Sequence, residues 1–132
     1  IRSGAGNKEP ASQLLAKKPE PVSPVNRIVV RKGNAINLIP VEQIRYVEAQ
    51  DDYVMIYHSN GKALKQQTMK FYEDNLSKTD FVRIHRSYIV RVEEIKRIEP
   101  YGKDNHVAIL QSGDKLPVSR AGFRQLKEEL NF

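Results

Sequence analysis

Cysteine is absent from this sequence, which excludes a disulfide framework and any metal site built on thiolates. Histidine is scarce: His58, His85 and His106 are scattered without the spacing of metal ligands, so we expect neither a metal nor another cofactor. No apolar run approaches the length that spans a membrane, and no secretory signal is visible. The sequence starts at Ile1 and is expected to be a fragment of a cytoplasmic protein.

Recognisable catalytic arrangements are missing as well. His85 and Ser87 lie two residues apart, but no third group completes a nucleophilic triad. No glycine-rich loop is present to cradle a phosphate, because the glycines after the linker are isolated at turn or packing positions: Gly33, Gly61, Gly102, Gly113 and Gly122. Neighbouring carboxylates such as Glu93 and Glu94 have the character of solvated pairs. We therefore expect a protein without enzymatic activity.

Positive charge is in moderate excess. The 132 residues suit one domain and carry a net charge of +6. Residues 27–132 hold 18 basic and 14 acidic side chains, a balance of +4. This balance is compatible with nucleic acid as a partner but does not require one, because a specific site needs its cations gathered on one side.

Composition divides the chain at residue 26. Residues 1–26 are rich in proline, glycine, serine and lysine and predict a linker, in which residues 11–18 could form one short helix. From residue 27 onward, β-branched runs alternate with turn signals such as Asn60-Gly61. A single helical turn is expected at residues 40–43. The predicted strands cover residues 28–30, 35–39, 44–49, 53–57, 63–67, 81–85, 95–98, 106–110 and 115–118.

Two helices are predicted among these strands. Thr68 is a suitable N-cap for a helix over residues 69–76, and Ser119 is one for a final helix over residues 120–130. The sequence therefore predicts a mainly β fold of short, mostly antiparallel strands with one short internal helix and a C-terminal helix. Each helix has an apolar stripe that we expect to pack on the core: Met69, Tyr72 and Leu76 in the first, and Phe123, Leu126 and Leu130 in the second.

The predicted strand over residues 81–85 ends in a cationic turn. Val82 and Ile84 alternate with Arg83 and His85, so the two pairs should face opposite sides of the strand. The alternation stops at Arg86, and a rigid strand could hold this guanidinium against a phosphate or a base edge. The competing interpretation is a solvated strand end whose charges have no role.

Arg120 stands in the first turn of the final helix, where a cation opposes the helix dipole at a cost of about 0.3–1 kcal/mol. A residue placed against its local preference is a candidate for function. Arg120 and the free N–H groups of that turn could together form an anion site. Alternatively, Arg120 pairs with a nearby carboxylate such as Glu99 or Asp104.

A polar corner follows the predicted strand over residues 44–49. Gln50 could contact adenine, and Tyr53 could donate a hydrogen bond to a phosphate. Asp51 and Asp52 would repel phosphates, so we expect them to orient one of the two arginines or to accept from cytosine. The loop over residues 101–105 could add backbone contacts, although a solvated hairpin tip is the simpler expectation.

Three motifs in this sequence together resemble the LytTR-type DNA-binding domain. They are residues 44–49 (IRYVEA), residues 81–90 (FVRIHRSYIV, followed by Ile95 and Ile98) and residues 116–120 (LPVSR). The match covers residues 27–132, and the combination is more specific than any single motif. The resemblance implies an elongated, LytTR-like arrangement of short strands with little helix.

The resemblance also implies the output domain of a response regulator of the LytR/AlgR kind. In such regulators a phosphorylatable receiver domain, served by a sensor histidine kinase, precedes the DNA-binding domain. Residues 1–26 would then be the tail of that connection, and residues 27–132 the LytTR-like domain. The family inserts loops, rather than a recognition helix, into the major groove of direct repeats in promoter DNA and bends it. The function implied is transcription regulation through double-stranded DNA.

Position by position, the resemblance places DNA contacts at Arg86, at Arg120 and in the corner after Glu48-Ala49. Two departures from the family stand out: Arg91 replaces the usual asparagine, and Asp51-Asp52 makes the corner acidic, which affects the base preference expected there. The alternative to DNA binding is a β-rich protein-interaction module that binds no nucleic acid. The full set of candidate DNA-binding residues is Arg86, Arg120, Asp52, Tyr53, Val54, His85 and Ser119.

Overall fold

The fold of the described chain is mainly β, as the sequence predicts. A computed structural model describes residues 26–132, so the helix expected over residues 11–18 and nearly all of the linker lie outside the described part. Every strand pairing between residues 26 and 132 is antiparallel. In the same part of the chain, no helix is long and apolar enough to cross a membrane.

The elements agree with the predicted ranges to within two residues, except that strand β8 (Tyr88–Arg91) and the turn η2 (Val92–Glu94) were not among the predicted elements. The helices are α1 (Met69–Asn75) and α2 (Arg120–Leu130), and the expected turn at residues 40–43 is η1 (Val41–Gln43). The strands are β2 (Arg27–Lys32), β3 (Ala35–Pro40), β4 (Ile44–Gln50), β5 (Tyr53–His58), β6 (Gly61–Lys65), β7 (Phe81–His85), β8 (Tyr88–Arg91), β9 (Ile95–Pro100), β10 (His106–Leu110) and β11 (Lys115–Val118).

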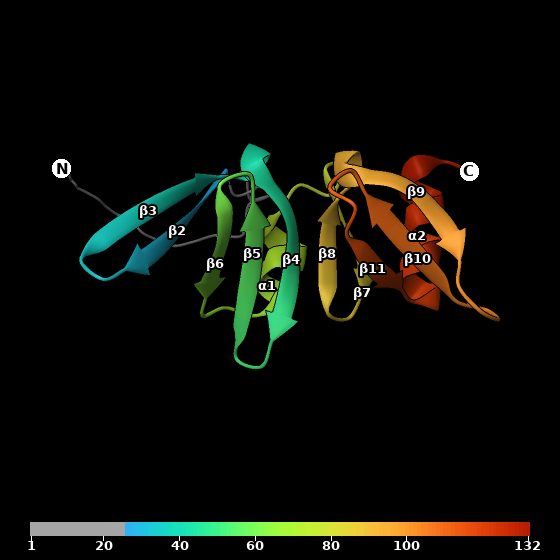
Figure 1. The fold of residues 1–132 in the computed structure, drawn as a ribbon, viewed down its shortest axis with the longest axis horizontal. Helices are drawn as coiled ribbons and strands as arrows, with labels where there is room; N and C mark the ends of the chain where they lie inside the picture. The colour runs from blue at the N-terminus through green and yellow to red at the C-terminus, as the bar shows by residue number, and fades with distance from the viewer. Residues whose placement is uncertain (1–25) are drawn as a thin grey trace, which may run out of the picture.

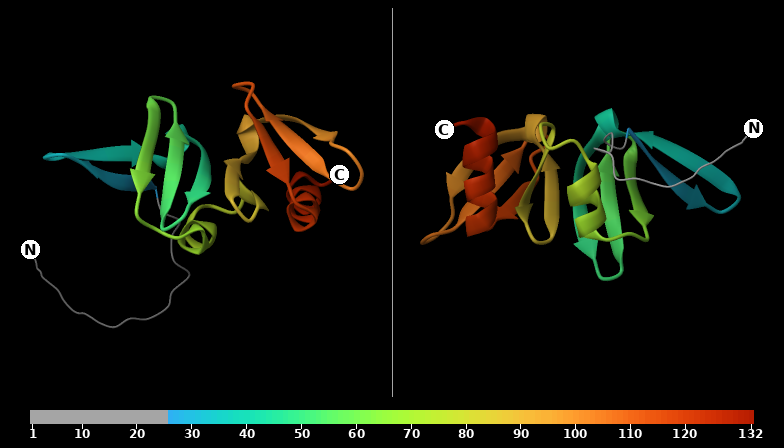
Figure 2. Two further views of the ribbon diagram at one scale, coloured as in Figure 1. Left: turned by 60° about the horizontal axis from the view of Figure 1, so that its bottom comes forward. Right: turned by 180° about the vertical axis from the view of Figure 1, so that it is seen from behind.

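A five-stranded sheet, ordered β6-β5-β4-β8-β7, forms the middle of an elongated molecule (Figure 1). The β2–β3 hairpin lies at one end of the long axis. The three-stranded sheet β11-β10-β9 and helix α2 lie at the other end. Seen from behind, α1 lies across β4 and β5, and α2 runs beside β7 (Figure 2). The strands of the central sheet therefore run across the long axis and end in turns along its two edges.

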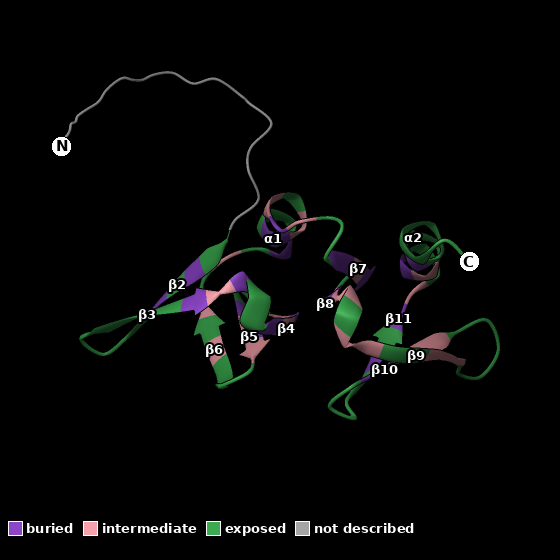
Figure 3. Cartoon of the chain, turned by 90° about the horizontal axis from the view of Figure 1, so that it is seen from above, coloured by how far each residue is buried: buried purple, intermediate pink, exposed green. Residues whose placement is uncertain are grey.

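The central sheet is buried on both faces, because alternate residues of its strands enter two separate cores. Val47 of β4 and Ile89 of β8 belong to the first core, which α1 and the β2–β3 hairpin complete. Tyr46 and Val90, their neighbours in sequence, belong to the second core, which β9–β11 and α2 complete. Figure 3 shows the buried positions gathered where these layers meet. The sheet is consequently held in place from both sides.

Helix α1 confirms the predicted cap and the predicted apolar stripe. The side-chain oxygen of Thr68 accepts from the backbone N–H of Phe71 at 3.0 Å, which satisfies one of the free donors of the first turn. Met69, Tyr72 and Leu76 are buried in the first core, so this stripe is a packing surface. Helix α1 therefore holds its other side chains, including the partly buried Glu73, in a fixed relation to the sheet.

Helix α2 has the predicted bounds and cap, but the prediction that three of its residues are buried is wrong for one of them. The Ser119 side chain accepts from the Gly122 N–H at 2.9 Å, and Leu126 is fully buried. Leu130, expected in the core, is 39% exposed. The buried positions of the helix are Gly122 and Leu126, which places its contact with the sheet in the first two turns and leaves the last turn outside.

Gly122 sets the distance between α2 and β7. A Cβ atom at this position would lie 1.9 Å from the carbonyl oxygen of Ile84, a backbone atom that cannot swing aside. The absence of a side chain therefore lets the first turn of α2 rest directly on the end of β7. The Ser119 N–H donates to the same Ile84 oxygen at 2.8 Å, so the start of the helix is also hydrogen-bonded to that strand.

We expect Gly122→Ala to lower the free energy of unfolding by about 1–3 kcal/mol, the usual range for overpacking. The loss can be larger here, because the backbone of Ile84 has to move to make room for the added methyl group. Helix propensity alone predicts the opposite sign, since alanine in a helix is favoured over glycine by about 1 kcal/mol. Urea denaturation measures the difference, with Glu128→Ala on the exposed face of α2 as control. A Gly122→Ala variant more stable than the wild type would contradict the close contact.

Candidate nucleic-acid interface

Three turns that carry the candidate residues meet at one edge of the molecule. The Ala49 N–H, at the end of β4, donates to the Ser87 carbonyl oxygen at 2.9 Å, which joins the polar corner to the turn between β7 and β8. The bond from Ser119 to Ile84 joins the start of α2 to the last residues of β7, which lead into the same turn. All three lie along the lower edge in Figure 1. Residues far apart in sequence are thus placed side by side by backbone hydrogen bonds.

The turn between β7 and β8 has a closed internal geometry. The Nδ1 atom of His85 accepts from the Ser87 N–H at 3.1 Å, which requires this nitrogen to be unprotonated. Burial, and then the charges of Arg86 and Arg83, lower the pKa of His85, in keeping with a neutral ring. The Arg86 side chain is exposed at the outside of the turn. The turn therefore has an ordered backbone and one free cationic side chain.

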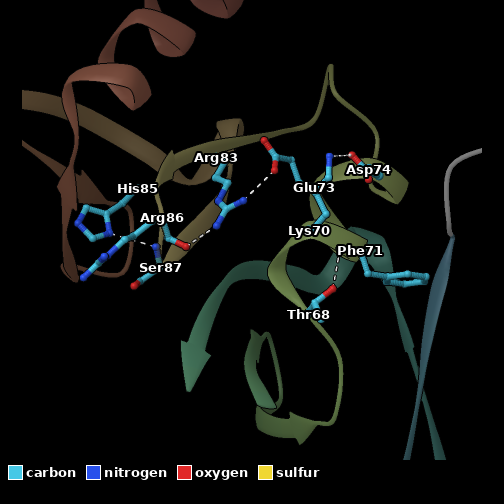
Figure 4. A network of polar contacts seen from close by, with 9 residues as sticks. All are labelled: Thr68, Lys70, Phe71, Glu73, Asp74, Arg83, His85, Arg86 and Ser87. Carbon is cyan, nitrogen blue, oxygen red and sulfur yellow. Dashed lines mark hydrogen bonds and ion pairs between the residues drawn. The ribbon is translucent and has the colours of Figure 1, made fainter. Parts of the chain in front are cut away.

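Arg83 braces this turn, a contact that the sequence analysis did not foresee (Figure 4). One guanidinium nitrogen of Arg83 donates to the carbonyl oxygen of Arg86 at 2.6 Å, and another meets the Glu73 carboxylate of α1 at 2.8 Å. Within residues 26–132, neither Asp51 nor Asp52 forms an ion pair with any arginine. The expectation that the acidic corner orients Arg86 or Arg120 is therefore wrong; the carboxylate that acts on this turn comes from α1.

Arg120 stays largely free despite a carboxylate nearby. Its guanidinium lies 3.8 Å from Asp104, one of the two carboxylates expected as its partner, and the two side chains are 77% and 61% exposed. Pairs this exposed contribute about 0–1 kcal/mol, so a stronger anion can replace Asp104 at little cost. Glu99, the other carboxylate considered, pairs instead with Arg97.

The two candidate arginines flank one strip of surface. A hollow lined by Arg86 and another lined by Arg120 both include His85 and Ser119. The second hollow continues along the loop over residues 101–105, where Tyr101 is exposed. Arg86 and Arg120 therefore lie on either side of a shared floor. The Ser119 hydroxyl, as the α2 cap, already accepts from the Gly122 N–H.

The polar corner presents Tyr53 and Asp52 but not Val54. Tyr53 is 41% exposed, whereas Val54 is 1% exposed and belongs to the first core, because successive side chains of β5 point to opposite faces. Val54 is therefore removed from the set of candidate DNA-contacting side chains. Asp51 has a φ of 53°, which turns the chain sharply between β4 and β5. The Gln50 side chain is also occupied, since it donates to Glu48 at 3.4 Å.

Arg91, which stands where the resemblance leads us to expect asparagine, is a structural residue. It donates to the carbonyl oxygens of Ile44, at 2.8 Å, and of Val41. Its guanidinium also lies 4.6 Å from the centre of the Phe81 ring. Arg91 thereby ties the far end of β8 to η1, away from the edge that carries Arg86.

Glu48 anchors the strands immediately behind the three turns. Its two carboxylate oxygens accept from the hydroxyls of Tyr57, at 2.9 Å, and Tyr88, at 2.8 Å. Burial, with the hydrogen bond and charge of Glu48, raises the pKa of Tyr88 to about 12. Both tyrosines must keep their protons to donate, so the network holds β4, β5 and β8 together only while they are neutral.

We expect the stability of the wild type to fall as the pH rises from 10 to 12. The folded-state pKa of Tyr88 lies above the unfolded value of about 10, so its contribution is complete below pH 10 and is lost as the pH rises through 12. Tyr88→Phe should therefore show a shallower fall in the free energy of unfolding than the wild type or Tyr53→Phe, the exposed control. Parallel curves for all three proteins would refute the coupling.

Comparison with known proteins agrees with this geometry. Residues 34–131 match the family described as the LytTr DNA-binding domain. The positive alginate biosynthesis regulatory protein of Pseudomonas aeruginosa is 35% identical over 127 residues, which cover 89% of this chain and 51% of that protein. The sensory transduction protein LytT of Bacillus subtilis is 29% identical over 107 residues, covering 81% of this chain and 44% of that protein.

A solved LytTr DNA-binding domain from Bacillus cereus has the same fold, with a TM-score of 0.74 at 24% identity over 82% of this chain and 99% of that one. The chain spans about half the length of the curated relatives it matches. The family match covers more than half of the sequence and includes all three motifs and all three turns of the edge. The chain therefore belongs to the family of LytTr DNA-binding domains.

Proposed function

We propose that this chain is the sequence-specific DNA-binding output domain of a response regulator of the LytR/AlgR kind. The observation that carries the proposal is the edge at which Arg86, Arg120 and the corner with Tyr53 meet on hydrogen-bonded turns. A cationic edge held by a rigid sheet fits a groove of duplex DNA, because phosphate contacts need fixed cations and base contacts need fixed orientation. The alternative, a protein-interaction module, gains no support from the family match.

Arg86 and Arg120 are the residues that read or clamp the DNA in this proposal. Each side chain is exposed, and a guanidinium can donate two parallel hydrogen bonds to guanine or to a phosphate. The turns enter the major groove of direct repeats and bend the duplex, while surrounding lysines and arginines supply the salt-dependent part of the affinity.

The remaining candidates have supporting roles in the proposal. The Tyr53 hydroxyl donates to a phosphate, and Asp52 accepts from a cytosine amino group, which restricts the bases tolerated at the corner. His85 contributes a neutral ring at the floor between the two arginines. Ser119 fixes the start of α2, since its hydroxyl already caps the helix.

The proposed setting is a longer regulator. Residues 1–26 would connect this domain to an upstream receiver that a sensor histidine kinase phosphorylates, and transcription would be regulated in the cytoplasm. This setting is supported by the relatives, about half of whose length the chain spans.

We expect Arg86→Ala and Arg120→Ala each to weaken binding to a specific duplex by about 1–3 kcal/mol, with an unchanged unfolding curve. The measurement is a fluorescence-anisotropy titration at one fixed salt concentration, with a duplex selected from a random pool by the wild type. Arg31→Ala is the matched control, because Arg31 is an exposed arginine on the β2–β3 hairpin, remote from the edge. Equal affinity of all four proteins would overturn the assignment of contacts.

A salt titration distinguishes the proposal from its alternative. Counterion release predicts that the affinity of the wild type for DNA falls steeply as salt rises, and that the slope becomes shallower by about one when a phosphate-contacting cation is removed. Absence of duplex binding at low salt would favour the protein-interaction module.

A further inference from the structure

Arg83 holds two groups at once, and neither belongs to its own strand. One nitrogen donates to the Arg86 carbonyl oxygen at 2.6 Å, and the other meets Glu73 at 2.8 Å (Figure 4). Arg83 points toward α1 because Val82 and Ile84, its neighbours on β7, fill the second core on the opposite face. Its side chain therefore bridges the helix on one face of the sheet and the turn at its edge.

We propose that Glu73 and Arg83 are positioning residues, which orient Arg86 for DNA without touching the DNA. The inference rests on the proposed function, in which the Arg86 side chain contacts the duplex. The Arg86 carbonyl that Arg83 binds is in the same residue, so fixing that carbonyl restricts the direction in which the side chain leaves the turn. A turn whose backbone is ordered before binding loses less conformational freedom when DNA arrives.

The brace is anchored in the protein core. Glu73 lies on α1 next to Tyr72, which is 1% exposed, and Leu76 of the same helix end is also buried. The Arg83–Glu73 pair is itself partly shielded, with about a third or less of each side chain exposed. Shielding strengthens a charged hydrogen bond relative to one in open solvent. The position of the turn is thereby tied to the packing of α1.

One polar atom shows that the arrangement carries a cost. The Nε atom of Arg83 is buried and has no hydrogen-bond partner within residues 26–132. An unsatisfied buried donor is unfavourable, and this cost is set against the two hydrogen bonds that the other guanidinium nitrogens make, to Glu73 and to the Arg86 carbonyl.

The sign of one substitution separates positioning from plain electrostatics. Glu73 adds a negative charge near the edge that would meet phosphates, so removing that charge should by itself strengthen DNA binding. A positioning role predicts the opposite, because Arg83 loses its charged partner and the turn loosens. Asp74, the next residue on α1, provides a matched control: it is a carboxylate that pairs with Lys70 at 3.2 Å and touches neither Arg83 nor the turn.

The experiment compares Glu73→Gln with Asp74→Asn in anisotropy titrations with the selected duplex. We expect Glu73→Gln to weaken binding about tenfold, which corresponds to about 1.4 kcal/mol. Asp74→Asn should bind as tightly as the wild type or slightly more so. In the Arg86→Ala background, Glu73→Gln should lower the affinity for DNA less than about twofold, because the side chain that Glu73 helps to position has been removed. Wild-type or tighter binding by Glu73→Gln, or an equal loss in both backgrounds, overturns the proposal.

Amide hydrogen exchange of the free protein tests the brace without DNA. The Ser87 N–H, bonded to His85, and the Ala49 N–H, bonded to Ser87, should exchange faster in Glu73→Gln than in Asp74→Asn. If Glu73→Gln does not fold, Arg83→Lys replaces it, because lysine keeps the charge but cannot span both partners. Unchanged exchange in the folded variant overturns the brace. If exchange rises but Arg86→Ala leaves DNA affinity unchanged, the proposed contact fails and the brace stands.

Discussion

The turn between β7 and β8 is the point on which the geometry of the edge depends. The backbone of this turn and of the strand that leads into it is bound from three directions: Ser87 accepts from Ala49 of β4, Ile84 of β7 accepts from Ser119 at the start of α2, and Arg86 accepts from Arg83. Loops are usually more mobile than the elements they connect, and these bonds restrict that mobility here. With the carbonyls fixed, the exposed Arg86 side chain is the main freedom left in the turn. A binding residue held on a fixed backbone is the arrangement expected of a DNA-binding site on a rigid domain.

The two cores make this arrangement possible. The central sheet is packed on both faces, which restricts its movement relative to the rest of the domain. Helix α1 packs against one face, and β9–β11 with α2 pack against the other. Gly122 brings the first turn of α2 onto the backbone of β7, so the cation at the helix start lies next to the turn that carries Arg86. The helix is thus placed by its first two turns, and its end is free, as the exposed Leu130 shows.

Local patterns in the sequence predicted nearly all of the elements. Alternation placed Val82 and Ile84 in a core, the caps at Thr68 and Ser119 marked both helix starts, and the motifs indicated the family. What local patterns could not supply was contact between distant segments. The partner of Arg83 is on α1, and no spacing rule connects residue 73 to residue 86. The alternation of β7 did contain one usable signal, because it put Arg83 on the face opposite the second core.

Errors at the site have the same origin. The acidic corner was expected to orient an arginine, yet Asp51 and Asp52 lie exposed in the turn between β4 and β5, and within residues 26–132 they pair with no arginine.

The proposed DNA contact is one edge of the molecule, made of three turns. Its most direct test is a map of backbone amide chemical-shift changes on titration with the selected duplex. We expect the changes to gather at residues 50–53, 85–88, 101–105 and 119–121. Chemical-shift changes concentrated instead on the β2–β3 hairpin, at one end of the molecule, or at η1, on the opposite edge, would contradict a DNA contact at this edge.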